Sequence, residues 1–564
     1  MPALLTIVFI LSGAAGLMYE SIWSRYLGLF VGHSAYAQVI VLVIYLGGMS
    51  IGAAMVAGRS ARLRDPLIGY AVIEIIVGII GLFFHDIFQA ATAFAYSSLF
   101  PSLAGGATLT VVKWSLAALL ILPQAVLLGM TFPLMTAGYL RRVSKDGREN
   151  SGRVLGGLYF ANSIGAAGGV LIAGFYLIGK VGLPGTILAA AMVNILVGLT
   201  VYGAARFATE NSDDEVVAPA ADAVQVVEAA MPTEPLAPAQ PAQPAQPAQP
   251  TQPTQPTLHF LWRAMLIVAG GTALSSFIYE IAWIRMLSLV LGSATHSFEI
   301  MLSAFILGLA LGALWVRGRA DTFRDPIRAL AVTQWAMGAL AVMTLTAYLA
   351  TFNWMAFLIQ GLDQNAEGYQ LFSVAKYGIA LAVMVPATFC AGVTLPLITR
   401  ILIGGGGGER SIGAVYSINT LGSIIGAALA ALILMPLIGL KALLITGGVI
   451  DMVIGVWLMF VAGRNRADTR RFATALIGAT VLVIAAGAIN ATFDRGILIS
   501  GVYRYGTVPE PGERNRDVVF YQDGRTATVS VRKASDGSYS IATNGKPDAS
   551  LSAPWFEDDS TTIT

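Results

Sequence analysis

The fold is decided by a stretch that occurs twice, LMYESIWSR at residues 17–25 and FIYEIAWIR at residues 277–285. Tyr, Glu, Trp and Arg recur in the same order, at an offset of 260 residues. Further matches continue at offsets of 260, 263 and 257, and they include Arg59/Arg319, Pro133/Pro396 and Asn162/Asn419. A similarity that persists along both stretches with small changes of offset indicates an internal duplication.

Both copies are strongly apolar. Hydrophobic residues make up 56% of the 564 residues and charged residues only 12%, about half of what a soluble domain carries. Each copy divides into six apolar segments, and most are long enough to cross a hydrocarbon core of about 30 Å. The segments cover residues 3–31, 36–58, 67–96, 107–140, 153–179 and 183–206, then 262–291, 296–316, 327–358, 370–402, 411–437 and 440–462.

An even number of segments in each copy means that both copies insert the same way up. We therefore predict an all-α polytopic membrane protein with two parallel six-helix repeats, residues 1–207 and 258–465, which is the major-facilitator-like arrangement. Residues 208–257 are acidic at first and then repeat Pro, Ala and Gln, so we predict a disordered linker there.

A thirteenth apolar segment and a short tail follow the second copy. We predict an additional transmembrane helix within residues 466–492, although a helix lying on the membrane surface is the alternative. Asp-Gly and Asn-Gly pairs separate short runs of β-forming residues at 518–521, 526–532 and 539–543. Such pairs are strong hairpin signals, so residues 493–564 should form a small antiparallel β module.

Basic residues orient the chain. They cluster at residues 59–64 and 141–153 in the first copy and at residues 317–328 and 400–410 in the second, while the alternate loops are nearly free of them. Positively charged loops stay in the cytoplasm, so we predict a cytoplasmic amino terminus and linker. If the thirteenth segment spans, the tail is periplasmic.

Several kinds of chemistry find no support. Cys390 is the only cysteine, and the four histidines show no metal-ligand spacing, so we predict no metal site and no catalytic residue. The net charge of +2 gives no bulk attraction to nucleic acid. No glycine-rich loop follows a strand, and we therefore predict no cofactor.

Ionisable residues inside the segments are the main candidates for function, because they are costly in a bilayer. They recur as Glu20, Arg25 and Lys113 in the first copy and as Glu280, Arg285 and Lys376 in the second. Each copy carries one further acid inside a segment, Glu74 and Glu299. At a rise of about 1.5 Å per residue, Glu20 and Lys113 lie at compatible depths for an ion pair, as do Glu280 and Lys376. Two interpretations remain open: neutralised pairs between helices, or a path for a substrate or ion.

Aromatic and proline residues recur as well. Tyr19 and Trp23, like Tyr279 and Trp283, stand four residues apart and share a helix face, which suits packing and also an organic ammonium.

The fourth segment of each copy carries two prolines and a Gly-x-Thr-x-Pro element, and these prolines are Pro123, Pro133, Pro386 and Pro396. The prolines indicate either packing kinks or interrupted helices beside a binding site.

These motifs resemble those of a known family: bacterial fused proteins that join a major-facilitator-like membrane part to a spermidine synthase. The resemblance rests on the duplicated Tyr-Glu-x-x-Trp-x-Arg, the Gly-x-Thr-x-Pro element, the repeated Tyr-x-x-Asn at residues 159–162 and 416–419, and FYQDGRTATV at residues 520–529. The tail is similar to the first β-sheet of an aminopropyltransferase. The resemblance implies a bacterial inner membrane and a polyamine-like ligand.

Three functions are open at this point. The first is a membrane protein that binds or moves a small organic amine without catalysing transfer. The second is a non-catalytic accessory or scaffold subunit that docks to other membrane subunits. The third is a membrane-anchored aminopropyltransferase whose catalytic domain is missing from this chain, because the synthases of this family continue into a nucleotide-binding domain that residues 493–564 do not contain.

The sequence predicts that the 564-residue chain transfers no aminopropyl group. The tail offers hairpins but no cofactor loop. Purified protein incubated with putrescine and decarboxylated S-adenosylmethionine should form no spermidine, whereas a soluble spermidine synthase in the same assay should. Steady turnover by the chain itself would contradict the prediction.

Overall fold

The structure is a computed structural model of the full chain. It describes residues 2–31, 34–103, 106–143, 151–214, 255–292, 295–363, 365–462, 467–524 and 527–551. Most of the predicted linker, and residues 552–564 of the tail, lie outside these ranges. Both ends of the predicted linker are helical, since the flanking helices extend to Asp214 and begin again at Gln255.

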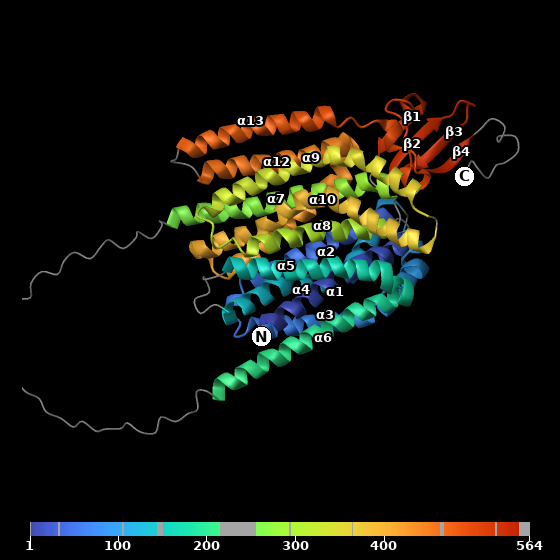
Figure 1. Ribbon diagram of the computed structural model, residues 1–564. Helices are drawn as coiled ribbons and strands as arrows, with labels where there is room; N and C mark the ends of the chain where they lie inside the picture. The colour runs from blue at the N-terminus through green and yellow to red at the C-terminus, as the bar shows by residue number, and fades with distance from the viewer. Residues whose placement is uncertain are drawn as a thin grey trace, which may run out of the picture.

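Long helices make up both halves. The first half contains α1 (Pro2–Val31), α2 (Ser34–Ala57), α3 (Pro66–Phe94), α4 (Gly106–Val143), α5 (Ser151–Leu171) and α6 (Ile178–Asp214). The second half contains α7 (Gln255–Leu291), α8 (Thr295–Arg317), α9 (Pro326–Gly361), α10 (Ala366–Leu402), α11 (Arg410–Leu429) and α12 (Met435–Ala462). The helix α13 (Ala467–Asn490) follows and lies beside α12 and α9 (Figure 1). The predicted fold class is confirmed.

The repeated Asp-Pro dipeptide explains where two of these helices begin. Asp65 caps α3, because its Oδ1 accepts a hydrogen bond of 2.9 Å from the backbone N–H of Leu67. Asp325 caps α9 in the same way, through a bond of 3.0 Å from the N–H of Arg328. The proline that follows each cap occupies the first helical position, where no backbone N–H is needed.

Eleven helical stretches of the described residues are long and apolar enough to cross a membrane. Two of them, Ser151–Phe207 and Arg410–Val461, each hold two crossings, because the chain turns back at Gly182 and Gly439. Both glycines have positive φ, +67° and +73°, which side-chain-bearing residues rarely adopt. The described chain therefore has thirteen crossings, as the apolar segments predicted.

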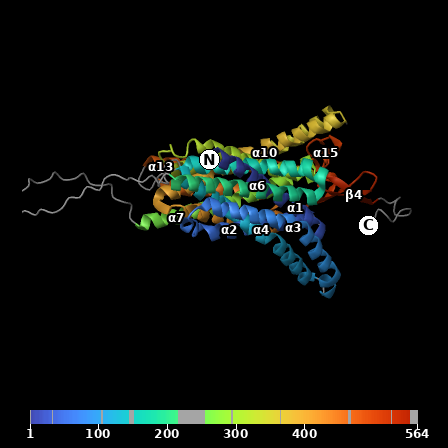
Figure 2. The same ribbon diagram turned by 90° about the horizontal axis from the view of Figure 1, so that it is seen from below.

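The halves meet along two pairs of helices, α2 with α11 and α5 with α8. Ser50 on α2 and Ser417 on α11 each donate to the backbone carbonyl of the other, at 2.9 and 3.1 Å. Ser303 on α8 donates to the carbonyl of Ala167 on α5 at 3.0 Å. Seen from below, the α3–α4 and α9–α10 hairpins spread away from this core at one end (Figure 2).

Inside the first half, a buried carboxylate links three helices. Glu74 on α3 accepts hydrogen bonds from Ser12 on α1 at 2.5 Å and from the amide of Asn194 on α6 at 2.8 Å. All three residues are buried. A buried carboxylate has to be hydrogen-bonded, so this cluster fixes α1, α3 and α6 to one another.

The second half carries the same two kinds of group at the repeat positions, with their order exchanged. At the repeat position of Glu74 stands the amide Gln334, and at that of Asn194 stands the acid Asp451. Asp451 accepts a hydrogen bond of 2.6 Å from Tyr279. Each half thus contains one acid and one amide at these positions. The acid stands on α3 in the first half and on α12 in the second, and the amide stands on α6 and on α9.

The tail follows α13 at the end of the bundle opposite to the amino terminus (Figure 1). After the short helices α14 (Arg495–Leu498) and α15 (Val502–Tyr505), it forms a four-stranded antiparallel sheet in the order β1 (Val518–Asp523), β2 (Thr528–Lys533), β3 (Tyr539–Thr543) and β4 (Lys546–Leu551). The three predicted strands are present. The fourth, β4, was not predicted, and it follows the tight turn at Asn544 and Gly545, which both have positive φ. Below, "amino-terminal end" and "tail end" denote the two ends of the bundle.

The thirteen crossings predict that Ser212 and Ser538 lie on opposite sides of the membrane. In a Cys390→Ser background, single cysteines at these two positions should react with a membrane-impermeant thiol reagent from opposite faces of sealed vesicles. Detergent-opened vesicles, in which both should react, are the control. Reaction of both from the same face would contradict the arrangement.

Candidate functional site

A cavity of about 190 Å³ lies between the two halves. Its lining comes from α1, α2, α4 and α5 of the first half and from α7, α8, α10 and α11 of the second. A water molecule occupies about 30 Å³ in the liquid, so this space holds several waters or one small molecule. We call it the central cavity.

The central cavity contains two acids and no basic side chain among its lining residues. The acids are Glu20 on α1 and Glu280 on α7, the repeated glutamates of the two halves. Both are buried, and they line the same cavity, one from each half. Neither forms an ion pair with another described residue. The cavity therefore offers a carboxyl group from each half, with no basic side chain among the lining residues.

Polar and aromatic side chains complete the lining. Tyr45, Asn162 and Asn419 contribute hydroxyl and amide groups, and Phe277 and Phe305 contribute rings. The Tyr-x-x-Asn motif in both copies was the signal for the asparagines, whereas nothing in the sequence pointed to Tyr45 or Phe305. Hydrogen-bonding groups and rings around a negative centre suit an organic ammonium ion.

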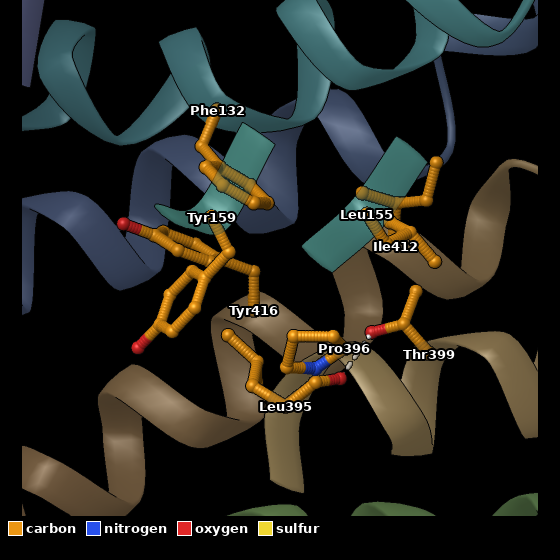
Figure 3. A pocket seen from close by; sticks show the side chains of 8 residues that line it. All are labelled: Phe132, Leu155, Tyr159, Leu395, Pro396, Thr399, Ile412 and Tyr416. Atoms are coloured by element: carbon orange, nitrogen blue, oxygen red, sulfur yellow. Dashed lines mark hydrogen bonds between the residues drawn. The ribbon is translucent and has the colours of Figure 1, made fainter. Parts of the chain in front are cut away.

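Toward the amino-terminal end, an aromatic cluster narrows the space. The rings of Phe132 and Tyr416 are stacked with centroids 5.1 Å apart, and Tyr159 meets Phe132 edge-on at 6.0 Å. Figure 3 shows these rings together, with Leu395 beside them. The space beyond measures only about 10 Å³, about one water-sized probe. We call Phe132, Tyr159, Leu395 and Tyr416 the aromatic cluster.

The Gly-x-Thr-x-Pro elements carry two members of this cluster. Phe132 and Leu395 each precede the proline of their element, Pro133 and Pro396. Gly129 packs so closely on α2 that an added Cβ would lie 2.2 Å from the carbonyl oxygen of Met49.

The threonines of the elements bond within their helices. Thr131 donates to the carbonyl of Leu128 at 2.7 Å, and Thr394 to that of Ala391 at 2.6 Å. The glycine thus packs helices together and the residue before the proline lines the cavity. Both α4 and α10 continue through their prolines as single helices, without an interruption.

Polar contacts join the two halves at the amino-terminal end. Arg141 at the end of α4 forms a bidentate ion pair with Glu409, in which both hydrogen bonds measure 2.7 Å. Asp321 of the second half accepts from the backbone N–H groups of Gly152 and Arg153, at 3.1 and 2.9 Å. These N–H groups begin α5, and helix amino termini attract anions. The halves are thus fastened at this end by charge as well as by stacked rings.

One ion pair joins the halves at the tail end. Arg25 on α1 contacts Glu299 near the start of α8, whose carboxylate is buried. His296 also lies 3.2 Å from Glu299, and its ring stacks on Phe175 of the first half. Glu299 was recognised as an acid within a segment, but its pairing with Arg25 was not predicted. We call Arg25–Glu299 the outer ion pair.

The predicted lysine–glutamate pairs are wrong. Lys113 does not pair with Glu20, and its Nζ lies 5.4 Å from the ring centroid of Phe100. Lys376 does not pair with Glu280, and its Nζ lies 5.1 Å from the ring centroid of Phe372. The glutamates line the central cavity and the lysines do not. Lys113 instead meets a ring in the connection between α3 and α4, which an estimate of depth from residue spacing did not reveal.

The repeated aromatic residues pack within their own halves and are absent from the cavity lining. Tyr19 stacks on Trp23, with centroids 5.5 Å apart. In the second half Tyr279 lies 5.4 Å from Trp283, whose indole N–H donates to Thr344 on α9 at 3.0 Å. All four side chains are buried. Their shared helix face thus packs against neighbouring helices.

The described residues contain no group of three or more His, Cys, Asp or Glu side chains arranged to hold a metal ion. The cavity carboxylates come from two different halves, and their neighbours are amides, hydroxyls and rings.

The helix arrangement defines a two-half membrane protein with a central cavity. Among solved structures, the chain is similar to the transporter FucP in its outward conformation, a Major Facilitator Superfamily member (14% identity, TM-score 0.44, covering 81% of this chain and 98% of that one). It is also similar to the human organic anion transporter MFSD10 (14% identity, TM-score 0.38, with the same coverage). TM-scores below 0.5 carry no argument about function, and the fold class rests on the helix arrangement itself. No family model and no curated protein matches the chain.

The outer ion pair should show energetic coupling. Arg25→Met and Glu299→Gln should each lower the thermal stability of the purified protein. The double variant should lose about 1–3 kcal/mol less stability than the two single losses added together, because the residues touch.

Glu20→Gln and Lys113→Met provide the matched control, and their effects should add to within about 0.5 kcal/mol. Coupling between Glu20 and Lys113, with none between Arg25 and Glu299, would reverse the assignment of partners.

Proposed function

We propose that the chain transports a small organic cation by opening its central cavity first at one end and then at the other. The observation that carries the proposal is the pair Glu20 and Glu280, one from each half, facing a single cavity without a basic side chain. Buried carboxylates within a membrane mark a path for a cation when no cationic side chain neutralises them. A cation bound between the two carboxyl groups contacts both halves at once.

The contacts between the halves support the movement that transport needs. The aromatic cluster and Arg141–Glu409 close the amino-terminal end, and the outer ion pair closes the tail end. Each of these contacts joins one half to the other, so a rocking of the halves about the central cavity breaks one set while keeping the other. A ligand that contacts both glutamates contacts both halves. The free energy of its binding can therefore shift the equilibrium between the two positions of the halves.

The chemical class of the cation follows from the lining and from the resemblance. Rings and amides beside the carboxylates suit an ammonium group on a carbon chain, and the resemblance to fused spermidine synthases narrows this class to polyamine-like compounds. We further propose that the amino-terminal end faces the cytoplasm of a bacterium and the tail its periplasm, because the basic loops lie at the amino-terminal end.

A scaffold subunit that moves nothing is the second proposal kept from the sequence. The outward faces of α13 carry large apolar residues such as Val481, Leu482 and Ile489, all more than 60% exposed. These faces suit lipid as well as a neighbouring subunit. Stoichiometric partners on native purification, combined with no amine binding, would favour the scaffold. A catalytic aminopropyltransferase would need residues beyond those present in the tail.

Neutralising either cavity acid should weaken amine binding. Glu20→Gln and Glu280→Gln each remove one charge-assisted hydrogen bond, about 1.5–3 kcal/mol, and should lower the affinity for spermidine about 10- to 100-fold. Calorimetry on purified protein, and uptake of labelled spermidine into proteoliposomes, measure the two effects.

Asp451→Asn is the matched control, because it neutralises an acid that is equally buried but absent from the cavity lining. Its binding of spermidine should match that of the parent. Undetectable binding by the parent protein, or equal losses in all three variants, would contradict the proposed site.

A further inference from the structure

The two halves are related by an approximate two-fold axis. Since both copies insert the same way up, this axis runs along the bundle. It exchanges α2 with α8 and α5 with α11, which are the equivalent segments of the two copies. The helix pairs that join the halves, α2 with α11 and α8 with α5, are then exchanged for each other. An interface that maps onto itself in this way is two-fold symmetric.

The packing inside each half obeys the same symmetry. Gly165 on α5 lies so close to α1 that an added Cβ would collide with the backbone carbonyl oxygen of Ile10. The equivalent Gly422 on α11 meets the carbonyl oxygen of Gly270 on α7 in the same way. Ile10 and Gly270 are themselves repeat positions. Each half therefore holds its first and fifth helices together at the same contact.

The lining of the central cavity follows this axis. Every residue that the second half contributes has its repeat partner among the residues that the first half contributes. Each half therefore presents a carboxyl group, a side-chain amide and a hydroxyl at equivalent positions. We call these two sets the half-sites, and they consist of Glu20, Asn162 and Ser163 in the first half and of Glu280, Asn419 and Thr420 in the second.

The half-sites have unused capacity to accept hydrogen bonds. The side chains of both glutamates and both asparagines form no hydrogen bond with another residue that the structure describes. Glu20 is only 7% exposed and Glu280 only 3%, and a buried polar group without a partner is costly. Each half-site therefore calls for a ligand or water in the cavity. An alkylammonium group presents three N–H donors, which match the carboxyl and amide oxygens.

Apolar residues line the same cavity in symmetric pairs. Leu42 on α2 is matched by Leu302 on α8, and Leu46 is matched by Ile306. These side chains offer no hydrogen bond, and they suit the methylene groups of a ligand. The cavity thus combines two equivalent polar sets with an apolar lining that both halves share.

We propose that the central cavity takes a linear compound with an ammonium group at each end, and that each half-site binds one end. Two equivalent half-sites match two equivalent groups, whereas a compound with one ammonium group in one half-site leaves the other carboxyl group without a cation. The volume of about 190 Å³ leaves room for a carbon chain between the ends. The inference rests on the proposed function, of which it names the substrate class.

The test compares compounds with one and with two ammonium groups. Straight-chain diamines of increasing length, putrescine and cadaverine among them, are titrated by calorimetry into the purified full chain. Each is paired with the monoamine in which a methyl group replaces one ammonium group, such as pentylamine for putrescine. At the best length the diamine should bind at least about tenfold more tightly than its monoamine, because it makes a second set of charge-assisted hydrogen bonds.

Glu20→Gln and Glu280→Gln give a second measurement. Each should lower the affinity for the best diamine to about that of its monoamine, and the two losses should be similar because the half-sites are equivalent. The affinity for the monoamine should change little, since the other half-site remains. Asp451→Asn is the matched control, which leaves both half-sites intact and should bind both compounds as the parent does.

Equal affinity for diamine and monoamine at every length would overturn the two-ended site and leave a small organic cation as the ligand. A monoamine that loses as much affinity as the diamine in both glutamine variants would place a single ammonium group on the axis, which also overturns the two-ended site. The first comparison uses only the parent protein, so it decides even if both variants fail to fold.

Uptake of the best diamine into proteoliposomes is measured separately. Tight binding of the diamine without uptake would overturn transport and support the two-ended site. Uptake of monoamine and diamine alike, with equal affinities, would support transport and overturn the two-ended site. No binding of any amine would overturn both.

Discussion

An ionised side chain inside a bilayer needs an opposite charge, a set of hydrogen bonds or water, and the rest of this structure depends on how that need is met. Arg25 meets it with a carboxylate from the other half, and Arg285 donates a hydrogen bond to the backbone of the tail. Lys113 and Lys376 lie over phenylalanine rings. The cavity glutamates are left without a basic side chain, and a cavity is the one place in a membrane protein where that arrangement is supported, because a ligand or water can enter.

The overall architecture could be predicted from the sequence because each part of it follows from a local rule. Apolar segments of sufficient length, a repeat at nearly constant offset and basic residues in alternate loops are all read along the chain. The hairpins of the tail follow from Asp-Gly and Asn-Gly pairs. The site residues Glu20 and Glu280 were also recognisable, since a repeated acid in an apolar segment is costly and therefore informative.

The partners of those residues could not be predicted, because a partner depends on the direction in which a side chain points around the bundle. Depth along the membrane normal suggested Lys113 for Glu20, but Glu20 lines the central cavity and Lys113 contacts Phe100 in the connection between α3 and α4. The pairing of Arg25 with Glu299 joins residues whose offset is not that of the repeat, so no comparison of the two copies reveals it. The hydrogen bond of Arg285 is to a strand end more than two hundred positions away, at Gly524.

The exchange of acid and amide between Glu74–Asn194 and Gln334–Asp451 has a historical consequence. If both halves descend from one ancestral half, and if only acids and amides stood at these positions, the two arrangements are connected through a copy with two carboxylates or a copy with two amides. That copy was either the ancestral half itself or one of its descendants. The first kind places two like charges in the helix interior, and the second places no charge there at all. On that premise the polar core has tolerated one of those two states.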